Sequence, residues 1–148
     1  MAIKKERHII GKNDIADFPS FNLQNVKVKI DSGAYTSTIH CSKVEKTEDG
    51  LKVIFLEKKT KGYSGEIIHF QDYQIKKVRS SNGILQERFV VKGNITLFGQ
   101  NFNTEFTLTS RKLMRFPILL GRKLLNKGFL INTSQTNLSY KLKKKLSE

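Results

Sequence analysis

The sequence is poor in cysteine, in acidic residues and in long apolar runs, and each scarcity excludes a class of protein. Its one cysteine, Cys41, cannot form an internal disulfide, so a reducing compartment, the cytoplasm, is expected. No apolar run approaches the length needed to cross a membrane, and residues 1–7 lack the apolar stretch of a signal peptide. With 148 residues, 38% hydrophobic and 27% charged, the chain has the size and composition of one globular domain.

The scarcity of acidic residues leaves a strongly basic chain. Lys and Arg number 27 against 13 Asp and Glu, which gives a formal net charge of +14. Such a charge attracts polyanions: nucleic acid, an anionic membrane or an acidic peptide. A solvated basic surface is the alternative, because the lysines are mostly scattered. Aromatic residues make up 9%, include no tryptophan and form no aromatic-basic motif of an RNA-binding sheet, which argues against nucleic acid as a partner.

Only one group of lysines clusters, at positions 141, 143, 144 and 145. It lies near the end of the sequence, where chains commonly fray. We therefore expect one domain over residues 1–140, followed by a basic tail over residues 141–148.

Short β-type runs separated by turn signals dominate the rest of the chain. Asn82-Gly83 predicts a hairpin between two such runs, and Gly99-Gln100-Asn101 predicts another. Only residues 122–126, just after Leu119-Leu120-Gly121, have a helical pattern, and Gly128 is expected to end that helix. The sequence thus predicts an all-β domain, a small closed or rolled sheet, with one short helix. The expected strands are residues 26–30, 51–56, 67–70, 73–78, 85–92, 95–98, 102–108 and 129–132.

The most informative segment surrounds Asp31. Alternating apolar residues over 26–30 lead straight into this aspartate, so a strand is expected to fix the position of its carboxylate. Ser32-Gly33-Ala34 follows, and the glycine allows the backbone to turn sharply. Taken alone, this pattern also fits an Asp-Ser-Gly turn whose carboxylate caps its own loop. Residues 116–125 supply a second piece: an apolar strand, a glycine and a short helix-prone run.

Together these motifs resemble the retropepsin-like family of aspartic proteases. The similar proteins are bacterial, are often labelled ATP-dependent zinc proteases, and are associated with glutamate-ligase systems. The resemblance covers about residues 9–132 and implies a closed β-barrel of the acid-protease fold with Asp31 as the catalytic aspartate. It also places the hairpin of Ser80, Ser81, Asn82 and Gly83 where such proteases carry the flap that covers the substrate. The matching motifs are Ile10-Gly11-Lys12, residues 27–37, residues 78–83 with Gln86-Glu87-Arg88, residues 108–111, and Leu119-Leu120-Gly121-Arg122.

An aspartic protease needs two carboxylates that share one proton, one acting as base on the attacking water and the other as acid. Asp31 is the only one of five aspartates that lies in a D-[ST]-G context. We therefore expect a homodimer in which each subunit contributes one Asp31 across a two-fold axis. Ser32 and Gly33 are expected to hold the pair in place. Ala34 cannot donate the hydrogen bond that a hydroxyl residue would give the carboxylate, so the pair should keep its shared proton to higher pH.

No metal and no other cofactor is expected. The sequence contains neither H-E-x-x-H nor G-x-x-x-x-G-K-[ST], so it supports neither the zinc nor the ATP of the family label. The three histidines, His8, His40 and His69, lack the spacing of zinc ligands and are expected to lie in turns or to face solvent. His40 adjoins Cys41, but neighbouring strand residues point to opposite faces and seldom bind one ion together.

Four arginines lie in the family-like motifs: Arg79, Arg88, Arg111 and Arg122. One interpretation is that they brace the barrel through internal salt bridges. The other is that they form a pocket for acidic side chains, because a guanidinium binds a carboxylate with a two-pronged fork. The family's association with glutamate ligases implies a glutamate-rich substrate for such a pocket.

The resulting hypothesis is a cytoplasmic, metal-independent, homodimeric aspartic endopeptidase that acts on protein or peptide, with acidic or glutamate-rich tails as the candidate substrate. Asp31, Ser32, Gly33 and Ala34 would form the catalytic loop. The substrate would be bound by Arg79, Ser80, Ser81, Asn82, Gly83, Arg88 and Arg111. The alternative is a non-catalytic basic module of the same fold that binds an acidic protein, a ribosome or RNA.

Overall fold

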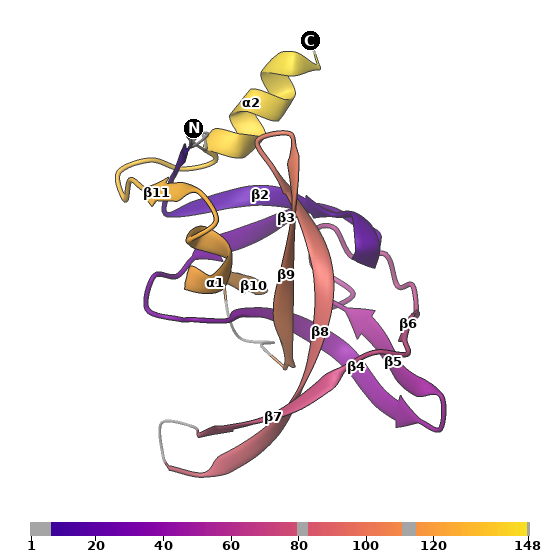
Figure 1. Ribbon diagram of the computed structural model, residues 1–148. Helices are drawn as coiled ribbons and strands as arrows, with labels where there is room; N and C mark the ends of the chain where they lie inside the picture. Colours follow the sequence, from indigo (N-terminus) through magenta and orange to yellow (C-terminus); the bar gives the residue numbers. More distant parts are fainter. Residues whose placement is uncertain (1–6, 80–82, 111–114, 148) are drawn as a thin grey trace, which may run out of the picture.

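The computed structural model describes residues 7–79, 83–110 and 115–147, and strands dominate it (Figure 1). The helical elements are a 3-10 turn, η1 (Pro19–Phe21), and two α-helices, α1 (Arg122–Leu125) and α2 (Leu138–Leu146). The strands are β1 (His8–Ile10), β2 (Asn13–Phe18), β3 (Leu23–Ile30), β4 (Ser37–Thr47), β5 (Gly50–Phe55), β6 (Ile68–Phe70), β7 (Gln74–Arg79), β8 (Leu85–Leu97), β9 (Gln100–Thr109), β10 (Ile118–Leu120) and β11 (Phe129–Ile131).

One sheet of nine strands closes on itself. Its order is β10-β3-β2-β8-β9-β4-β5-β6, and β7 pairs with β8 beside this path. Because β10 pairs with β3 on one side and with β4 on the other, the strands from β10 round to β4 form a ring. Alternate residues of β3 point into the ring, and their apolar side chains, Val26, Val28 and Ile30, are all buried in the core. The prediction of a mostly β chain with a closed sheet is confirmed in this form.

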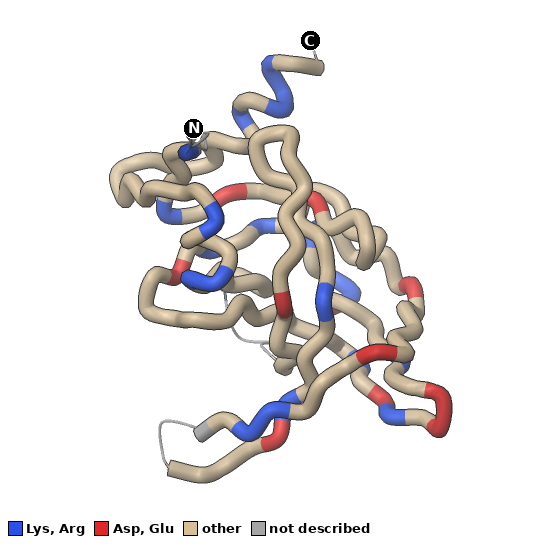
Figure 2. The backbone as a smooth tube through the Cα atoms, viewed as in Figure 1, with Lys and Arg blue, Asp and Glu red and all other residues tan. Residues whose placement is uncertain are grey.

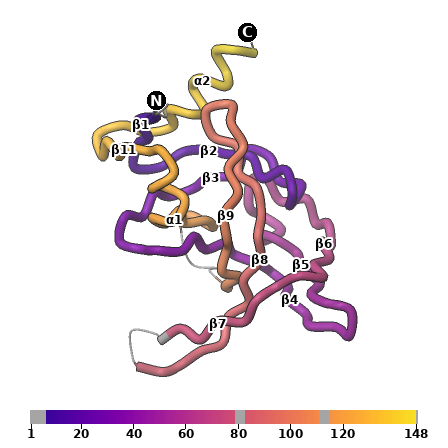
Figure 3. Tube along the Cα trace, viewed as in Figure 1, coloured from indigo at the N-terminus to yellow at the C-terminus, as the bar shows by residue number. Residues whose placement is uncertain are grey.

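Two parts of the chain extend from opposite ends of the ring (Figure 3). The β7–β8 hairpin projects at one end. The small parallel pair β1–β11 and the helix α2 lie at the other end. Within this hairpin, β7 has β8 as its neighbour in the sheet.

Strand β8 is continuous where the sequence predicted two runs. A Cβ on Gly93, near the middle of β8, would lie 2.3 Å from the ring of Phe21. The missing side chain of Gly93 therefore leaves space for the Phe21 ring in the core, and the strand continues through this position. The turn that follows is Phe98-Gly99, because Leu97 pairs with Gln100, and both turn residues have positive φ, 52° and 73°. The predicted hairpin exists, but its turn begins one residue earlier.

Helix α2 is an element that the sequence analysis missed, so the prediction of one short helix was wrong. Its first turn is held by Asp14 of β2, which is 1% exposed and accepts hydrogen bonds from the backbone N–H groups of Ser139 (3.0 Å) and Tyr140 (3.1 Å). Lys143 forms an ion pair with Asp17 at 2.8 Å. The predicted boundary between residues 140 and 141 lies inside this helix, and Figure 2 shows basic positions along its outer end.

No helix in the described part of the chain combines the length and the apolar character required to span a membrane.

Candidate active site

Asp31 lies directly beyond the last residue of β3, where two strands meet. Its backbone N–H donates to the carbonyl oxygen of Leu120 at 2.9 Å, and Leu120 of β10 pairs in parallel with Ile30 of β3. Both apolar residues are buried, with 0% and 8% exposure. The aspartate is therefore fixed to the edge of the core, while its own side chain is only half-buried.

The loop after Asp31 is a tight turn. The Oδ1 atom of Asp31 accepts a hydrogen bond from the backbone N–H of Gly33 at 3.0 Å, and the Asp31 carbonyl accepts one from the N–H of Ala34 at 3.2 Å. Ser32 and Gly33 are exposed. The self-capping Asp-Ser-Gly turn is thus formed, but it uses only one of the two carboxylate oxygens. Among the described residues, Oδ2 of Asp31 has no hydrogen-bond partner, so it can act on another molecule.

Gly121, in the motif of residues 116–125, packs closely against the loop that follows Asp31. A Cβ at this position would lie 2.7 Å from the carbonyl oxygens of both Tyr35 and Thr36, so no larger residue fits here without a shift. The backbone N–H of Gly121 donates to the Oγ of Ser37 at 3.1 Å, and Ser37 is fully buried. Ser37 lies in the motif of residues 27–37, but no pattern in the sequence assigns it this role.

The two residues after Gly121 hold the rim of the loop. The backbone N–H groups of Arg122 and Lys123 donate to the carbonyls of Ala34 (2.8 Å) and Tyr35 (2.9 Å). The guanidinium of Arg122 donates from Nη1 to the carbonyl of Ser32 at 2.9 Å and lies 5.7 Å from the centre of the Tyr35 ring. Among the described contacts, Arg122 therefore braces the Asp31 loop through hydrogen bonds to backbone carbonyls, not through the internal salt bridge of the first interpretation.

The other four aspartates are placed elsewhere. Asp14 and Asp17 bind α2, Asp49 lies in the turn between β4 and β5, and Asp72 precedes β7. Burial raises the pKa of Asp14 above its usual value, although the N–H groups of Ser139, Ile15 and Tyr140 oppose this shift. Within the described residues, one chain thus brings one aspartate to this loop.

Three of the predicted substrate-binding residues, Arg79, Gly83 and Arg88, lie in the described part of the β7–β8 hairpin. Arg79 pairs with Leu85 at its outer end, and Gly83 has a positive φ of 82°. Strand alternation places Arg88 on the face of β8 opposite to Val91, a core residue, so Arg88 lies on the outer face. There its Nη2 donates to Gln86 at 3.4 Å, and no described contact joins it to the Asp31 loop. The predicted site residues Ser80, Ser81, Asn82 and Arg111 lie outside the described residues.

Comparison of the sequence with known protein families shows the family to which the chain belongs. The model of the RimB-like family, described as "Retropepsin-like aspartic endopeptidase RimB", matches residues 9–141. The chain belongs to the RimB-like family. The resemblance inferred from the motifs, including its link to glutamate-ligase systems, is confirmed at this level.

Relatives of this RimB-like chain carry a different name. Proteins named "Probable alpha-L-glutamate ligase" from Shewanella halifaxensis and Shewanella pealeana are each 30% identical over 134 residues, which is 88% of this chain and 29% of theirs. The chain thus spans less than a third of the length of these relatives. A crystal structure of a Legionella pneumophila protein of unknown function has the same fold, with a TM-score of 0.70, 24% identity, and coverage of 88% of this chain and 97% of that one.

The histidines of this RimB-like chain differ in part from expectation. His40 is 2% exposed, and its Nε2 lies 2.8 Å from Oε1 of Glu57, so the prediction of a solvent-facing or turn histidine is wrong for this residue. Cys41 is buried as well, which raises the pKa of its thiol. No three His, Cys, Asp or Glu side chains converge to hold a metal ion in the part of the chain that the structure describes.

Proposed function

We propose that this protein is an aspartic endopeptidase whose catalytic unit is a homodimer. The observation that carries the proposal is the Asp31 loop: a half-buried carboxylate at a strand end, with one oxygen held by Gly33 and the other without a partner among the described residues. Gly121 packs against the backbone of this loop, and Arg122 donates hydrogen bonds to the carbonyls of Ser32 and Ala34 in it. Such rigid support is what a group that must meet a symmetry mate requires.

The chemistry follows from the pairing of two such loops. Two carboxylates at hydrogen-bond distance share one proton, because both cannot be ionised at close range. The ionised Asp31 would take a proton from an attacking water, and the protonated Asp31 of the second subunit would donate to the peptide carbonyl oxygen. Ser32, which is exposed beside Asp31, would line the junction between the subunits.

The peptide would lie between the Asp31 loop and the β7–β8 hairpin. Figure 1 shows the ends of β7 and β8 that are farthest from the ring on the same side of the molecule as the loop that follows β3. The hairpin exposes four large apolar side chains, Ile75, Val78, Ile84 and Leu85, by 41–58%. Exposed apolar side chains on a projecting hairpin suit a flap that closes on a peptide.

For the substrate, we propose an acidic protein or peptide, in the cytoplasm. The support is the net charge of +14 and the glutamate-ligase name of the relatives. Arg79, Arg88 and Arg111 stay candidates for binding its carboxylates. If the positive charge of the protein attracts the peptide over a distance, the KM for a glutamate-rich peptide should rise with salt concentration. The reason is that charges at the surface are screened over roughly 10 Å at an ionic strength of 0.1 M. A neutral peptide of equal length is the control.

The direct test of the proposed function is Asp31→Asn, assayed on a peptide library and on glutamate-rich peptides. The amide cannot act as the base, and the replacement is nearly isosteric, so cleavage should be abolished while the melting temperature stays unchanged. Full turnover by the purified variant on any substrate that the natural chain cleaves would refute an aspartic mechanism. A natural chain that cleaves nothing but binds acidic peptides would favour the non-catalytic basic module.

A further inference from the structure

We propose that Glu105 is a positioning residue that ties the β7–β8 hairpin to the Asp31 loop. The inference rests on the proposed function, because it assigns the hairpin the role of a flap. One carboxylate oxygen, Oε2 of Glu105 on β9, lies 3.1 Å from Nζ of Lys76 and 3.1 Å from Nζ of Lys123. The first lysine belongs to the hairpin strand β7, and the second belongs to α1.

Lys123 links this carboxylate directly to the catalytic loop. Its side chain binds Glu105, while its backbone N–H donates to the carbonyl of Tyr35 at 2.9 Å. Arg122, its neighbour, holds Ser32 and Ala34 in the same loop. A chain of contacts therefore runs from the Asp31 loop through α1 and β9 to the hairpin.

The hairpin depends on this tie for its position. β7 is an edge strand that pairs with β8. Among the side chains of residues 74–78, which the structure describes, Lys76 to Glu105 is the only hydrogen bond to another strand of the sheet. An edge hairpin held by its own ladder alone can tilt about its base. A side-chain contact to the ring restricts that tilt.

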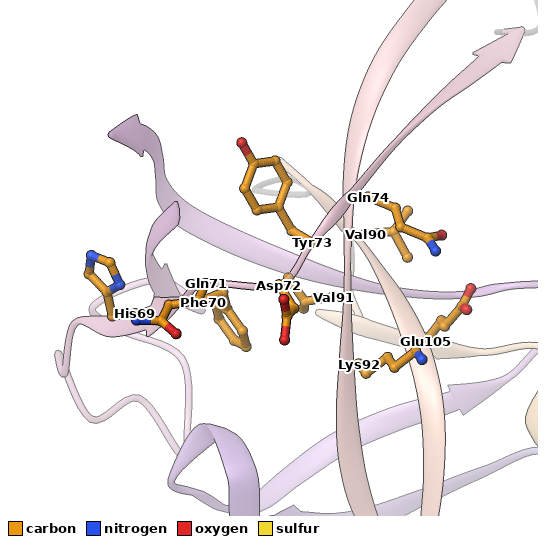
Figure 4. A pocket seen from close by; sticks show the side chains of 10 residues that line it. All are labelled: His69, Phe70, Gln71, Asp72, Tyr73, Gln74, Val90, Val91, Lys92 and Glu105. Atoms are coloured by element: carbon orange, nitrogen blue, oxygen red, sulfur yellow. The ribbon is translucent and has the colours of Figure 1, made fainter. Parts of the chain in front are cut away.

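A cavity beside the base of the hairpin leaves room for such a tilt. It has a volume of about 780 Å³ and lies between the segment leading into β7 and the strands β8 and β9 (Figure 4). Asp72 and Gln74 line it from the first side, and Lys92 and Glu105 line it from the second. The start of β7 is thus not packed tightly against the ring at this point, and Glu105 stands at the border of the space.

The burial of Glu105 gives the contact more weight than an ordinary surface ion pair. Its side chain is 15% exposed, against 48% for Lys76 and 35% for Lys123. Exposed single pairs are worth little, but a covered carboxylate shared by two ammonium groups is a small network. Lys92, the register partner of Glu105 on β8, adds a third positive charge nearby.

The test compares the natural chain with Glu105→Gln, Lys76→Met and the double variant. Hydrogen exchange of the backbone amides of β7 should accelerate about two- to fivefold in each single variant, as expected for loss of one ion pair. The double variant should exchange no faster than either single one, because the contact can be lost only once. For a cleaved peptide, KM should rise by a similar factor. Glu45→Gln breaks an exposed pair, Lys43 to Glu45 at 3.3 Å, and should change neither quantity.

Two results would overturn the proposal. One is a lower melting temperature with unchanged exchange in β7, which would make Glu105 an ordinary stabilising residue. The other is additive acceleration in the double variant. Lys76→Met, which changes a half-exposed side chain, keeps the test valid if Glu105→Gln folds poorly. Because exchange is read without a substrate, its outcome is separate from that of Asp31→Asn, which tests the peptidase activity itself.

Discussion

The Nη1 atom of Arg122 donates a hydrogen bond to the carbonyl oxygen of Ser32 at 2.9 Å, across 90 positions of sequence. The same guanidinium lies over the ring of Tyr35, which is 58% exposed. The motif of residues 116–125 thus contacts the Asp31 loop in two ways. The Arg122 guanidinium donates to it at the surface, and Gly121 packs closely against its backbone. Residues of both motifs therefore contact the loop that carries Asp31.

Arg122→Ala should therefore lower kcat more than it raises KM. We expect a loss of about tenfold in kcat, the size of one charged hydrogen bond that positions a catalytic loop. Steady-state kinetics measure this, and hydrogen exchange of residues 31–36 should accelerate in parallel. Lys46→Ala removes a positive charge on the exposed part of β4 and serves as the control. An effect on KM alone would indicate that Arg122 binds substrate instead.

Asp14→Ala should release α2 from the ring. The carboxylate accepts three backbone N–H groups, those of Ile15, Ser139 and Tyr140, and the last two belong to the first turn of the helix. Leaving them without an acceptor should cost about 2–3 kcal/mol of unfolding free energy. Denaturant unfolding measures the loss, and exchange in α2 shows where it occurs. Asp49→Ala, in an exposed turn, should cost much less.

The stability contributed by Glu105 should depend on pH. The hydrogen bond from Lys123, followed by that from Lys76, holds the pKa of Glu105 below its usual value of 4.5. A lowered pKa in the folded state means that the carboxylate stabilises the fold fully above pH 4.5 and that this contribution is lost as pH falls through the folded pKa. The natural chain should have a higher free energy of unfolding than Glu105→Gln above pH 4.5, and this difference should decrease as the pH falls through the folded pKa of Glu105. A difference in unfolding free energy that increases on acidification would contradict this assignment.

Strong chelators should leave peptidase activity unchanged. The proposed chemistry uses two carboxylates and a water, and it assigns no step to a metal ion. Assays with EDTA and with 1,10-phenanthroline, each against a buffer control, measure this. Activity that is lost in both and returns with added zinc would mean that the zinc label of such proteins describes this chain.

The sequence predicted the parts of the fold that local patterns encode. Alternation gave β3, and the motif around Gly121 gave β10 and α1. Strand β4 was missed because its register shifts between Cys41 and Lys43, which interrupts the alternation. Helix α2 was missed because its anchor, Asp14, lies 125 positions away and its lysines suggested a solvated tail.

The candidate site divides in the same way. Asp31 could be proposed from the sequence because its motif is continuous there. The support from Ser37 and the link through Glu105 could not be proposed, because each depends on contacts between strands far apart in the chain. His40 was expected at the surface, since nothing near it in the sequence reveals its partner Glu57.

The central claim, that two chains form one active site, is tested most directly by a mixed dimer. The natural chain and Asp31→Asn would be co-expressed with different tags, isolated through both tags in turn and assayed at once. If each subunit supplies half of the site, the mixed dimer should be inactive, although it contains one intact Asp31. Half of the activity of the natural dimer, or failure to isolate any mixed dimer from an active protein, would contradict the claim.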